Sequence, residues 1–182
     1  MPTETFTNEA IDIASLPKYE EISLTRPHAD YWKIMCISFT LYFVFFSIII
    51  ALGAIYVADF NDIATITISG YLVFMVALFF ILKISFKKRG YAIRTKDVIY
   101  KSGVIAESTT IVPLNRIQHI ELNEGIFSRM YHLGTLQIFT AGGATGHLQI
   151  SGIPIDEARS IRDLLLNKLD LLENQSTETQ NG

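Results

Sequence analysis

Two long apolar runs constrain the fold of this 182-residue chain more than any other feature. Residues 34–58 and residues 63–82 contain no charged side chain. An α-helix rises about 1.5 Å per residue, so about 20 apolar residues cross the ~30 Å hydrocarbon core of a bilayer. Both runs reach that length. The sequence therefore predicts a transmembrane helical hairpin over residues 34–86, with spans at about 34–58 and 63–82.

Charges beside the two runs predict how the hairpin is oriented. The short turn between the runs contains Asp59 and Asp62 but no lysine or arginine. A basic cluster follows the second run and consists of Lys83, Lys87, Lys88 and Arg89. Because Lys and Arg are enriched on the cytoplasmic side of membrane proteins, both termini are predicted to lie in the cytoplasm. The expected location is the plasma (inner) membrane, crossed twice.

The spans are predicted to anchor the protein rather than to transport ions. Ion and proton paths use ionisable side chains inside the membrane, and neither apolar run contains an acidic, basic or histidine residue. The single cysteine, Cys36, lies in the first run. It is expected to fill space there as a small apolar residue.

The polar ends of the chain are predicted to be flexible tails. Residues 1–33, expected to be cytoplasmic, carry three basic and six acidic side chains and show no apolar period. Residues 174–182 are also polar. Residues 87–182 carry eleven basic and ten acidic side chains, which is not the strong basic excess expected of a nucleic-acid-binding protein.

After residue 90 the pattern changes to short β-branched segments bounded by turn residues. Six strands are expected, within residues 91–95, 97–103, 104–113, 117–122, 134–140 and 147–151. A helical turn is expected at residues 124–132 and a hairpin loop at 142–146. Apolar residues spaced by three and four predict a final helix from about 154 to 172, with Pro154 in its first turn. The predicted fold class is an α+β membrane protein, in which a two-helix transmembrane hairpin precedes an antiparallel β-sandwich or barrel closed by a C-terminal helix.

The order of these parts and several short motifs resemble a known family. The motifs are Tyr91-x-x-x-x-Lys96-Asp97, Gly103, Val112-Pro113-Leu114-Asn115-Arg116-Ile117-Gln118, Gly125-x-Phe127-x-Arg129-x-x-x-Leu133-Gly134, Thr140-Ala141-Gly142-Gly143 and Ile153-x-x-x-Glu157-Ala158. In order and spacing they resemble those of the bacterial pleckstrin-homology-like membrane proteins of the YdbS-like kind. The resemblance implies a cytoplasmic pleckstrin-homology-like domain over residues 87–173, and it implies an architecture more than an activity.

Seven basic residues are candidate contacts for lipid headgroups or for a partner: Lys87, Lys88, Arg89, Arg94, Lys96, Arg116 and Arg129. The cluster at the end of the hairpin fixes the topology and, as an open alternative, attracts anionic headgroups with about 1 kcal/mol per residue. Eukaryotic pleckstrin-homology domains often bind phosphoinositides through the loop between their first two strands. Here that loop places Asp97 beside Arg94 and Lys96, so this function is not carried over. For Arg116 and Arg129 we favour structural bonds to loop carbonyls or to Glu121 and Glu124.

No catalytic constellation, metal site or cofactor site is predicted. The four histidines show no i, i+4 pair and no nearby cysteine, so a zinc site is not expected. No serine stands in a Gly-x-Ser-x-Gly motif. The carboxylates are scattered and do not occupy apolar surroundings that would raise a pKa.

These observations predict a non-enzymatic, membrane-anchored cytoplasmic module that mediates protein interaction or assembly at the inner face of the membrane. A module that senses anionic lipid or envelope stress is the alternative, and an enzyme or a transporter accessory subunit is a more remote one. The expected partners are the lipid bilayer and either another membrane protein or a second copy of the chain in a homo-oligomer, with no nucleic acid.

Overall fold

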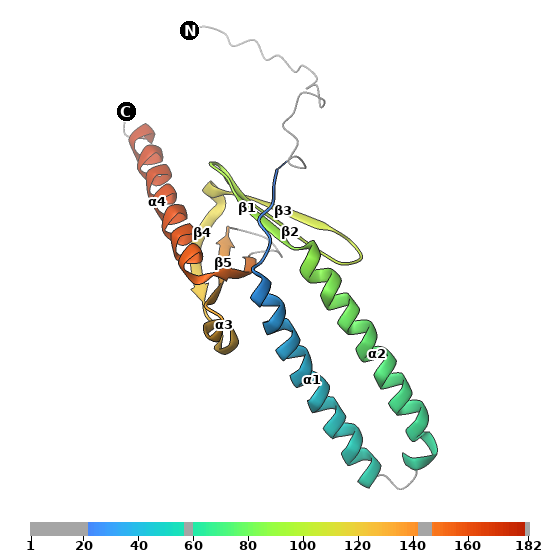
Figure 1. Cartoon of the computed structure of the whole chain (residues 1–182). Coiled ribbons are helices and arrows are strands. Elements are labelled where there is room, and N and C mark those ends of the chain that lie inside the picture. The colour runs from blue at the N-terminus through green and yellow to red at the C-terminus, as the bar shows by residue number, and fades with distance from the viewer. Residues whose placement is uncertain (1–21, 57–59, 142–146, 181–182) are drawn as a thin grey trace, which may run out of the picture.

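A computed structural model describes residues 22–56, 60–141 and 147–180 of the chain. Its elements are α1 (Ala29–Tyr56), α2 (Phe60–Lys88), β1 (Gly90–Ile93), β2 (Asp97–Ser102), β3 (Ser108–Pro113), the 3-10 turn η3 (Leu114–Arg116), β4 (Ile117–Asn123), α3 (Ile126–Met130), β5 (Leu133–Thr140), β6 (His147–Pro154) and α4 (Ile155–Gln180). In Figure 1, α1 and α2 form a long hairpin, and the remaining elements form a domain at one end of it.

The hairpin presents its apolar side chains outward. Among the described side chains of α1 and α2, only Ile34 and Met75 are buried within the molecule. The two helices contact each other through aromatic pairs, including Phe43 and Tyr71 with ring centroids 5.6 Å apart. The Tyr71 hydroxyl also donates a hydrogen bond of 2.6 Å to the Phe43 carbonyl oxygen. Both helices are long and apolar enough to cross a membrane, and their outward apolar surface suits a lipid environment.

Both helices extend beyond the apolar runs that predict them. α1 begins at Ala29 and α2 continues to Lys88, whereas the runs begin later and end earlier. Aromatic packing continues into these ends, because the ring centroids of Trp32 and Phe86 lie 5.7 Å apart. The pair of helices therefore reaches past the expected hydrocarbon core toward the domain.

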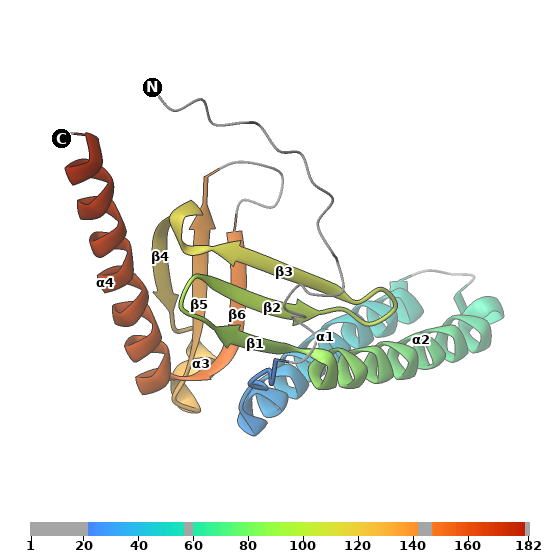
Figure 2. The same cartoon turned by 90° about the horizontal axis from the view of Figure 1, so that it is seen from above.

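The six strands form two three-stranded antiparallel sheets, ordered β1-β2-β3 and β4-β5-β6. Their strands cross at a steep angle in Figure 2, which gives a sandwich. The predicted antiparallel sandwich is confirmed. The word barrel does not describe it, because no pairing between the described strands joins one sheet to the other.

The core of the domain lies between the sheets and α4. Its most completely buried side chains come from both sheets and from α4, and they include Val98, Leu136, Ile138, Ile153, Ala158 and Leu165. The Tyr91 hydroxyl in β1 donates to Glu157 Oε1 at 2.9 Å and so ties the first sheet to the start of α4. Burial, followed by this hydrogen bond, raises the pKa of Tyr91. The C-terminal helix thus closes the sandwich, as predicted.

Several predicted boundaries differ from the structure. Residues 22–28 are not a free tail, because Thr25 pairs with Tyr91 in a β-bridge. α4 continues to Gln180 instead of ending near 172, because residues 173–180 contain no Gly or Pro to stop a helix that is already formed. Pro154 ends β6 rather than opening α4.

Some predictions fall on residues that the structure does not describe. They concern the first 21 residues of the expected N-terminal tail, Asp59 in the expected interhelical turn, the expected hairpin loop at 142–146, and residues 181–182. The described part of that interhelical turn belongs to α2, which begins at Phe60.

Candidate functional site

The segment before α1 fixes the domain onto the hairpin through backbone hydrogen bonds. The amide of Thr25 donates to the Tyr91 carbonyl oxygen at 2.8 Å, and the Tyr91 amide returns a bond of 2.9 Å to Thr25. The His28 amide donates to the Gly152 carbonyl oxygen at 2.8 Å. Gly152 has a positive φ of 81°, and a Cβ added there would lie 2.6 Å from Cγ of Tyr31. These bonds hold the segment between β1 and β6, next to the end of α2.

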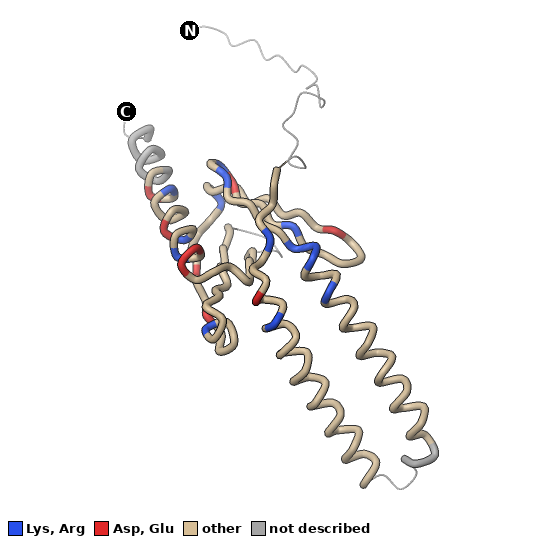
Figure 3. The backbone as a smooth tube through the Cα atoms, in the orientation of Figure 1, with Lys and Arg blue, Asp and Glu red and all other residues tan. Residues whose placement is uncertain are grey.

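A polar pocket of about 370 Å³ lies at this junction, and we call it the cationic pocket. It is lined by Ile22, Leu24, Arg26, Lys87, Lys88, Arg89, Gly90, Lys101 and Glu107. Three separate segments supply it: the stretch before α1, the end of α2, and the β2–β3 hairpin. Among the described residues that line it, five positive side chains accompany a single carboxylate, which gives these residues a net charge of +4. Figure 3 shows basic segments gathered where α2 enters the domain, above spans without charge.

The carboxylate of Glu107 pairs with two of the five cations. Lys101 Nζ lies 2.8 Å from Glu107 Oε2, and Lys88 Nζ lies 3.1 Å from Glu107 Oε1. Hydrogen bonds from Lys101 and then Lys88 lower the pKa of Glu107. Within the described part of the chain, Arg26, Lys87 and Arg89 have no carboxylate partner. The pocket therefore holds more positive charge than its own acid neutralises.

Arg89 marks the boundary between this pocket and the space between the two helices. Its guanidinium Nη2 lies 3.3 Å from the Ser85 hydroxyl, and its Nη1 lies 3.4 Å from the Tyr31 hydroxyl. Both partners are hydroxyl groups, so neither bond pairs the guanidinium with a carboxylate. Tyr31 also lines a second, apolar cavity.

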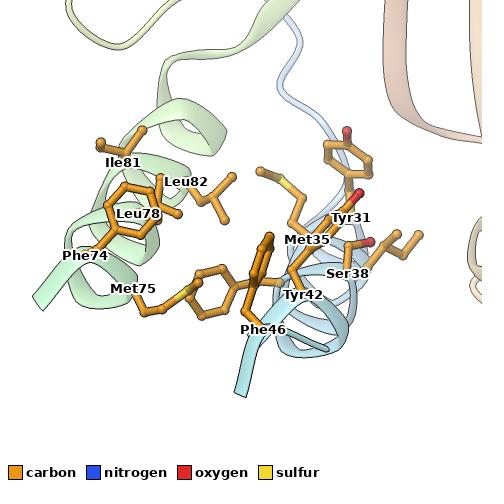
Figure 4. Close-up of a pocket in the computed structure, with 12 residues that line it drawn as sticks. Tyr31, Met35, Ser38, Tyr42, Phe46, Phe74, Met75, Leu78, Ile81 and Leu82 are labelled. Atoms are coloured by element: carbon orange, nitrogen blue, oxygen red, sulfur yellow. The ribbon is translucent and has the colours of Figure 1, made fainter. Parts of the chain in front are cut away.

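That second cavity lies between α1 and α2, and we call it the interhelical groove. It has a volume of about 380 Å³. It is lined by Tyr31, Ile34, Met35, Ser38, Phe39, Tyr42, Phe46, Phe74, Met75, Leu78, Ile81 and Leu82. Figure 4 shows side chains from both helices around this space, with Met35 of α1 and Leu82 of α2 pointing toward each other. None of the described residues that line the groove is a lysine, an arginine or a carboxylate, so its surface suits a hydrocarbon chain.

Large apolar side chains are exposed on two parts of the domain near the same end of the hairpin. Ile105 in the β2–β3 loop is 99% exposed, and Ile126 and Met130 in α3 are 83% and 68% exposed. In Figure 1 the loop lies beside the end of α2 and α3 lies beside the start of α1. The loop is held there because Lys88 Nζ donates to the Val104 carbonyl oxygen at 3.2 Å.

The structure brings together three of the seven residues that the sequence singles out. Lys87, Lys88 and Arg89 line the cationic pocket. Arg94 and Lys96 lie in the turn between β1 and β2. Because β1 begins directly after α2, this turn is at the end of the β1–β2 strand pair that is farther from α2. The Arg94 guanidinium forms an ion pair with the Asp97 carboxylate, and that bond raises the pKa of Arg94. Lys96 is exposed.

Arg116 and Arg129 do not make the ion pairs that we favoured for them. Arg116 lies in η3 and Arg129 in α3, and both are exposed. Glu124 instead pairs with Arg159 at 3.6 Å, and Glu121 lies 3.6 Å from His119. Neither arginine forms an ion pair or a side-chain hydrogen bond with another described residue. They also lie outside the cationic pocket.

Sequence reasoning missed three members of the pocket: Arg26, Lys101 and Glu107. A signal existed for Lys101, because a hairpin turning at residues 94–96 places Lys101 opposite Gly90. Glu107 belongs to the next hairpin, in which β3 begins at Ser108 rather than near residue 104, so that Glu107 lies in the β2–β3 loop close to Lys101. Arg26 had no such local signal, since only the distant pairing of Thr25 with Tyr91 brings it there.

The pocket has no arrangement typical of catalysis or metal binding. Glu107 has a lowered pKa, which makes it a weak base. In the described ranges, no group of three or more His, Cys, Asp or Glu side chains could hold a metal ion. The geometry supports binding of an anion.

Comparisons with known proteins agree with the architecture. The model of the family described as "Bacterial PH domain" matches residues 37–169. The UPF0699 transmembrane protein YdbS of Bacillus subtilis (strain 168) is 33% identical over 89 residues, which are 49% of this chain and 54% of that protein. The chain thus matches about half the length of this curated relative. No solved structure matches the chain.

Proposed function

Because the chain belongs to the bacterial PH domain family, as a membrane protein with two transmembrane helices, we propose that it is a non-enzymatic module that binds anionic lipid headgroups at the inner face of the membrane. The observation that carries the proposal is the cationic pocket, in which five cations face one carboxylate. This favours the lipid-sensing alternative over a role in protein interaction alone.

The position of the pocket supports a headgroup as its ligand. Lys87, Lys88 and Arg89 lie at the end of α2, a few residues beyond the apolar run that ends at residue 82, which is where headgroups are expected. Anionic lipids are abundant in the cytoplasmic leaflet, and each basic residue near such a surface contributes about 1 kcal/mol. Arginine and lysine are also the side chains that bind phosphate most effectively. The basic flank favours the cytoplasmic side for this end of the hairpin and for both termini.

A lipid-dependent stability measurement tests the proposal. The full chain, in a neutral detergent, is titrated with phosphatidylglycerol or with phosphatidylcholine while its thermal unfolding midpoint is recorded. A ligand that binds the folded state raises this midpoint, so we expect phosphatidylglycerol to raise it more than phosphatidylcholine. The difference should shrink as salt rises, because exposed charges are screened over about 10 Å at 0.1 M salt.

Matched variants identify the pocket as the source of the effect. Lys87→Gln and Arg26→Gln remove one charge each from the pocket and should reduce the preference for the anionic lipid. Lys96→Gln and Arg116→Gln remove the same charge elsewhere on the domain and should leave the preference unchanged. An equal response to both lipids in the unmodified protein would refute the proposal.

A second candidate function is assembly with another copy of the chain at the membrane. Leu164 and Leu171 lie seven residues apart on one side of α4, and they are 47% and 62% exposed. Leucines at this spacing on two helices pack together as in a coiled coil. In a Cys36→Ala background, isolated membranes treated with a mild oxidant should yield a disulfide-linked dimer of Leu164→Cys but not of Lys96→Cys. Crosslinking to a different membrane protein, or recovery of monomer alone, would count against the self-assembly.

A further inference from the structure

We propose that the cationic pocket and the interhelical groove together form one site for an intact anionic phospholipid, with the phosphate in the pocket and an acyl chain in the groove. The inference rests on the proposed function and names its ligand more closely: a membrane lipid molecule and not a soluble phosphate compound. Neither cavity alone indicates an intact phospholipid as the ligand. The conclusion follows from the adjacency of the two cavities and from their complementary chemistry.

The two cavities meet at a single hydrogen-bonded pair. Arg89 lines the pocket and Tyr31 lines the groove, and their side chains lie 3.4 Å apart. On α2, the residues that continue the groove toward the pocket recur at intervals of three and four, as Met75, Leu78, Leu82 and Ser85. Arg89 directly follows the helix, and its Nη2 lies 3.3 Å from the Ser85 hydroxyl at the end of this row. Residues at that spacing share one face of a helix. A ligand lying along this face therefore passes from hydrocarbon side chains to a guanidinium without crossing to another surface.

The groove is long enough to hold an acyl chain of one bilayer leaflet. Along α1 its lining extends from Tyr31 to Phe46, which corresponds to about 22 Å at 1.5 Å per residue. Half of the ~30 Å hydrocarbon core is about 15 Å. The groove thus begins at the domain end of the hairpin and extends over at least the depth that an acyl chain of the same leaflet occupies. Its volume of about 380 Å³ lies within the range of ~300–1,000 Å³ typical of ligand pockets.

The chemistry of the two cavities distinguishes an anionic phospholipid from simpler ligands. A soluble phosphate compound would satisfy the cations but would leave the apolar groove open. A zwitterionic lipid would fill the groove but would place its own cation among Arg26, Lys87 and Arg89, which have no carboxylate partner in the described part of the chain. Met35 and Met75 also face the groove, and their flexible side chains adapt to chains of different shape.

Native mass spectrometry of the full chain in neutral detergent tests the composite site. The probes are dioleoylphosphatidylglycerol, dioleoylphosphatidylcholine and glycerol 3-phosphate, which carries the phosphate without acyl chains. We expect one tightly held phosphatidylglycerol per chain, with phosphatidylcholine bound at least about tenfold more weakly, since 1.4 kcal/mol changes an equilibrium tenfold. Glycerol 3-phosphate should not displace the bound lipid at equal concentration.

Two groove variants separate the acyl chain from the headgroup. Leu78→Trp fills the groove and should weaken phosphatidylglycerol binding about tenfold, because the chain loses apolar contact area. Leu72→Trp is the control, because Leu72 also lies on α2 but is 48% exposed and does not line the groove. This variant should bind phosphatidylglycerol as tightly as the unmodified protein does. Ser38→Trp, on α1, repeats the test if Leu78→Trp disturbs the pairing of the helices. Helical content by circular dichroism checks that each variant is folded.

The outcomes distinguish failure of this inference from failure of the proposed function. The composite site is refuted if phosphatidylglycerol is preferred but Leu78→Trp and Ser38→Trp bind it normally. It is also refuted if glycerol 3-phosphate displaces the bound lipid. In either case the site recognises the headgroup alone. If the protein binds phosphatidylglycerol and phosphatidylcholine equally well, the proposed function fails and this inference fails with it.

Discussion

Gly152 in β6 closely approaches Tyr31 of α1. Its φ of 81° is one that side chains other than glycine rarely adopt, and an added Cβ would lie 2.6–2.9 Å from three ring and stem carbons of Tyr31. We expect Gly152→Ala to destabilise the protein by about 1–3 kcal/mol, the usual cost of a strained backbone conformation. A lower thermal unfolding midpoint of the full chain in detergent would show this.

Gly125→Ala is the matched control for that prediction. Gly125 has an ordinary φ of −67°, and the nearest atom to an added Cβ would be the Ser128 hydroxyl at 3.9 Å. Its effect should stay within about 0.5 kcal/mol. Equal effects of the two substitutions would show that the close approach to Tyr31 does not matter for stability.

Glu107 sets the charge of the cationic pocket and makes that charge dependent on pH. Because Lys101 and Lys88 lower its pKa, their ion pairs stabilise the fold above the unfolded-state pKa of the carboxyl and are lost as the pH falls through the lower folded-state value. Protonation then raises the pocket charge from +4 to +5. Acidification should therefore loosen the β2–β3 loop while strengthening the binding of anionic lipid.

Glu107→Gln reproduces the protonated state at neutral pH. We expect it to bind phosphatidylglycerol about fivefold more tightly, because the pocket gains one net positive charge near an anionic surface. Glu121→Gln removes an exposed carboxylate from β4, outside the pocket, and serves as the control. Unchanged or weaker lipid binding by Glu107→Gln, measured by the titration described above, would contradict this role.

Within the domain, the β2–β3 loop is expected to touch the membrane directly. Its Ile105 is 99% exposed, and the loop is tied to the end of α2 by Lys88. Transfer of an exposed side chain of this size into an apolar environment gains about 1.5–3 kcal/mol. In a Cys36→Ala background, an environment-sensitive dye at Ile105→Cys should report an apolar setting in nanodiscs.

The same dye at Lys96→Cys provides the comparison, because the β1–β2 turn lies at the end of the β1–β2 strand pair that is farther from α2. That probe should report water in nanodiscs and in detergent alike. If the dye at residue 105 also reports water, the loop does not enter the membrane surface, and its isoleucine needs another explanation.

The elements were predictable from the sequence where the signal is local. The two spans follow from apolar length, and the six strands and α4 follow from periods of two and of three to four residues. The cationic pocket was only partly predictable, because it combines three segments that are distant in sequence. Lys87, Lys88 and Arg89 were visible as a cluster. Arg26 was not, because its place depends on long-range backbone pairing between Thr25 and Tyr91, which side-chain patterns do not encode.

At the scale of the whole molecule, the hairpin and the domain are joined by more than the covalent link at Arg89. Thr25 pairs with β1, His28 bonds to β6, and Lys33 Nζ lies 5.8 Å from the Tyr131 ring centroid beside α3. The domain is thus held at a defined position against the end of the spans. This position gives the cationic pocket a fixed depth relative to the membrane, which a domain on a free linker would lack.

The proposed function depends on the orientation of this whole assembly in the membrane. The basic flank predicts that the domain and both termini are cytoplasmic and that the turn around Asn61 is outside. In a Cys36→Ala background, a membrane-impermeant thiol reagent added to intact cells should label Asn61→Cys. It should label Lys96→Cys only after the membrane is opened. The reverse pattern would place the cationic pocket on the outer side, away from the anionic cytoplasmic leaflet, and would remove the electrostatic basis for recognition at the inner face.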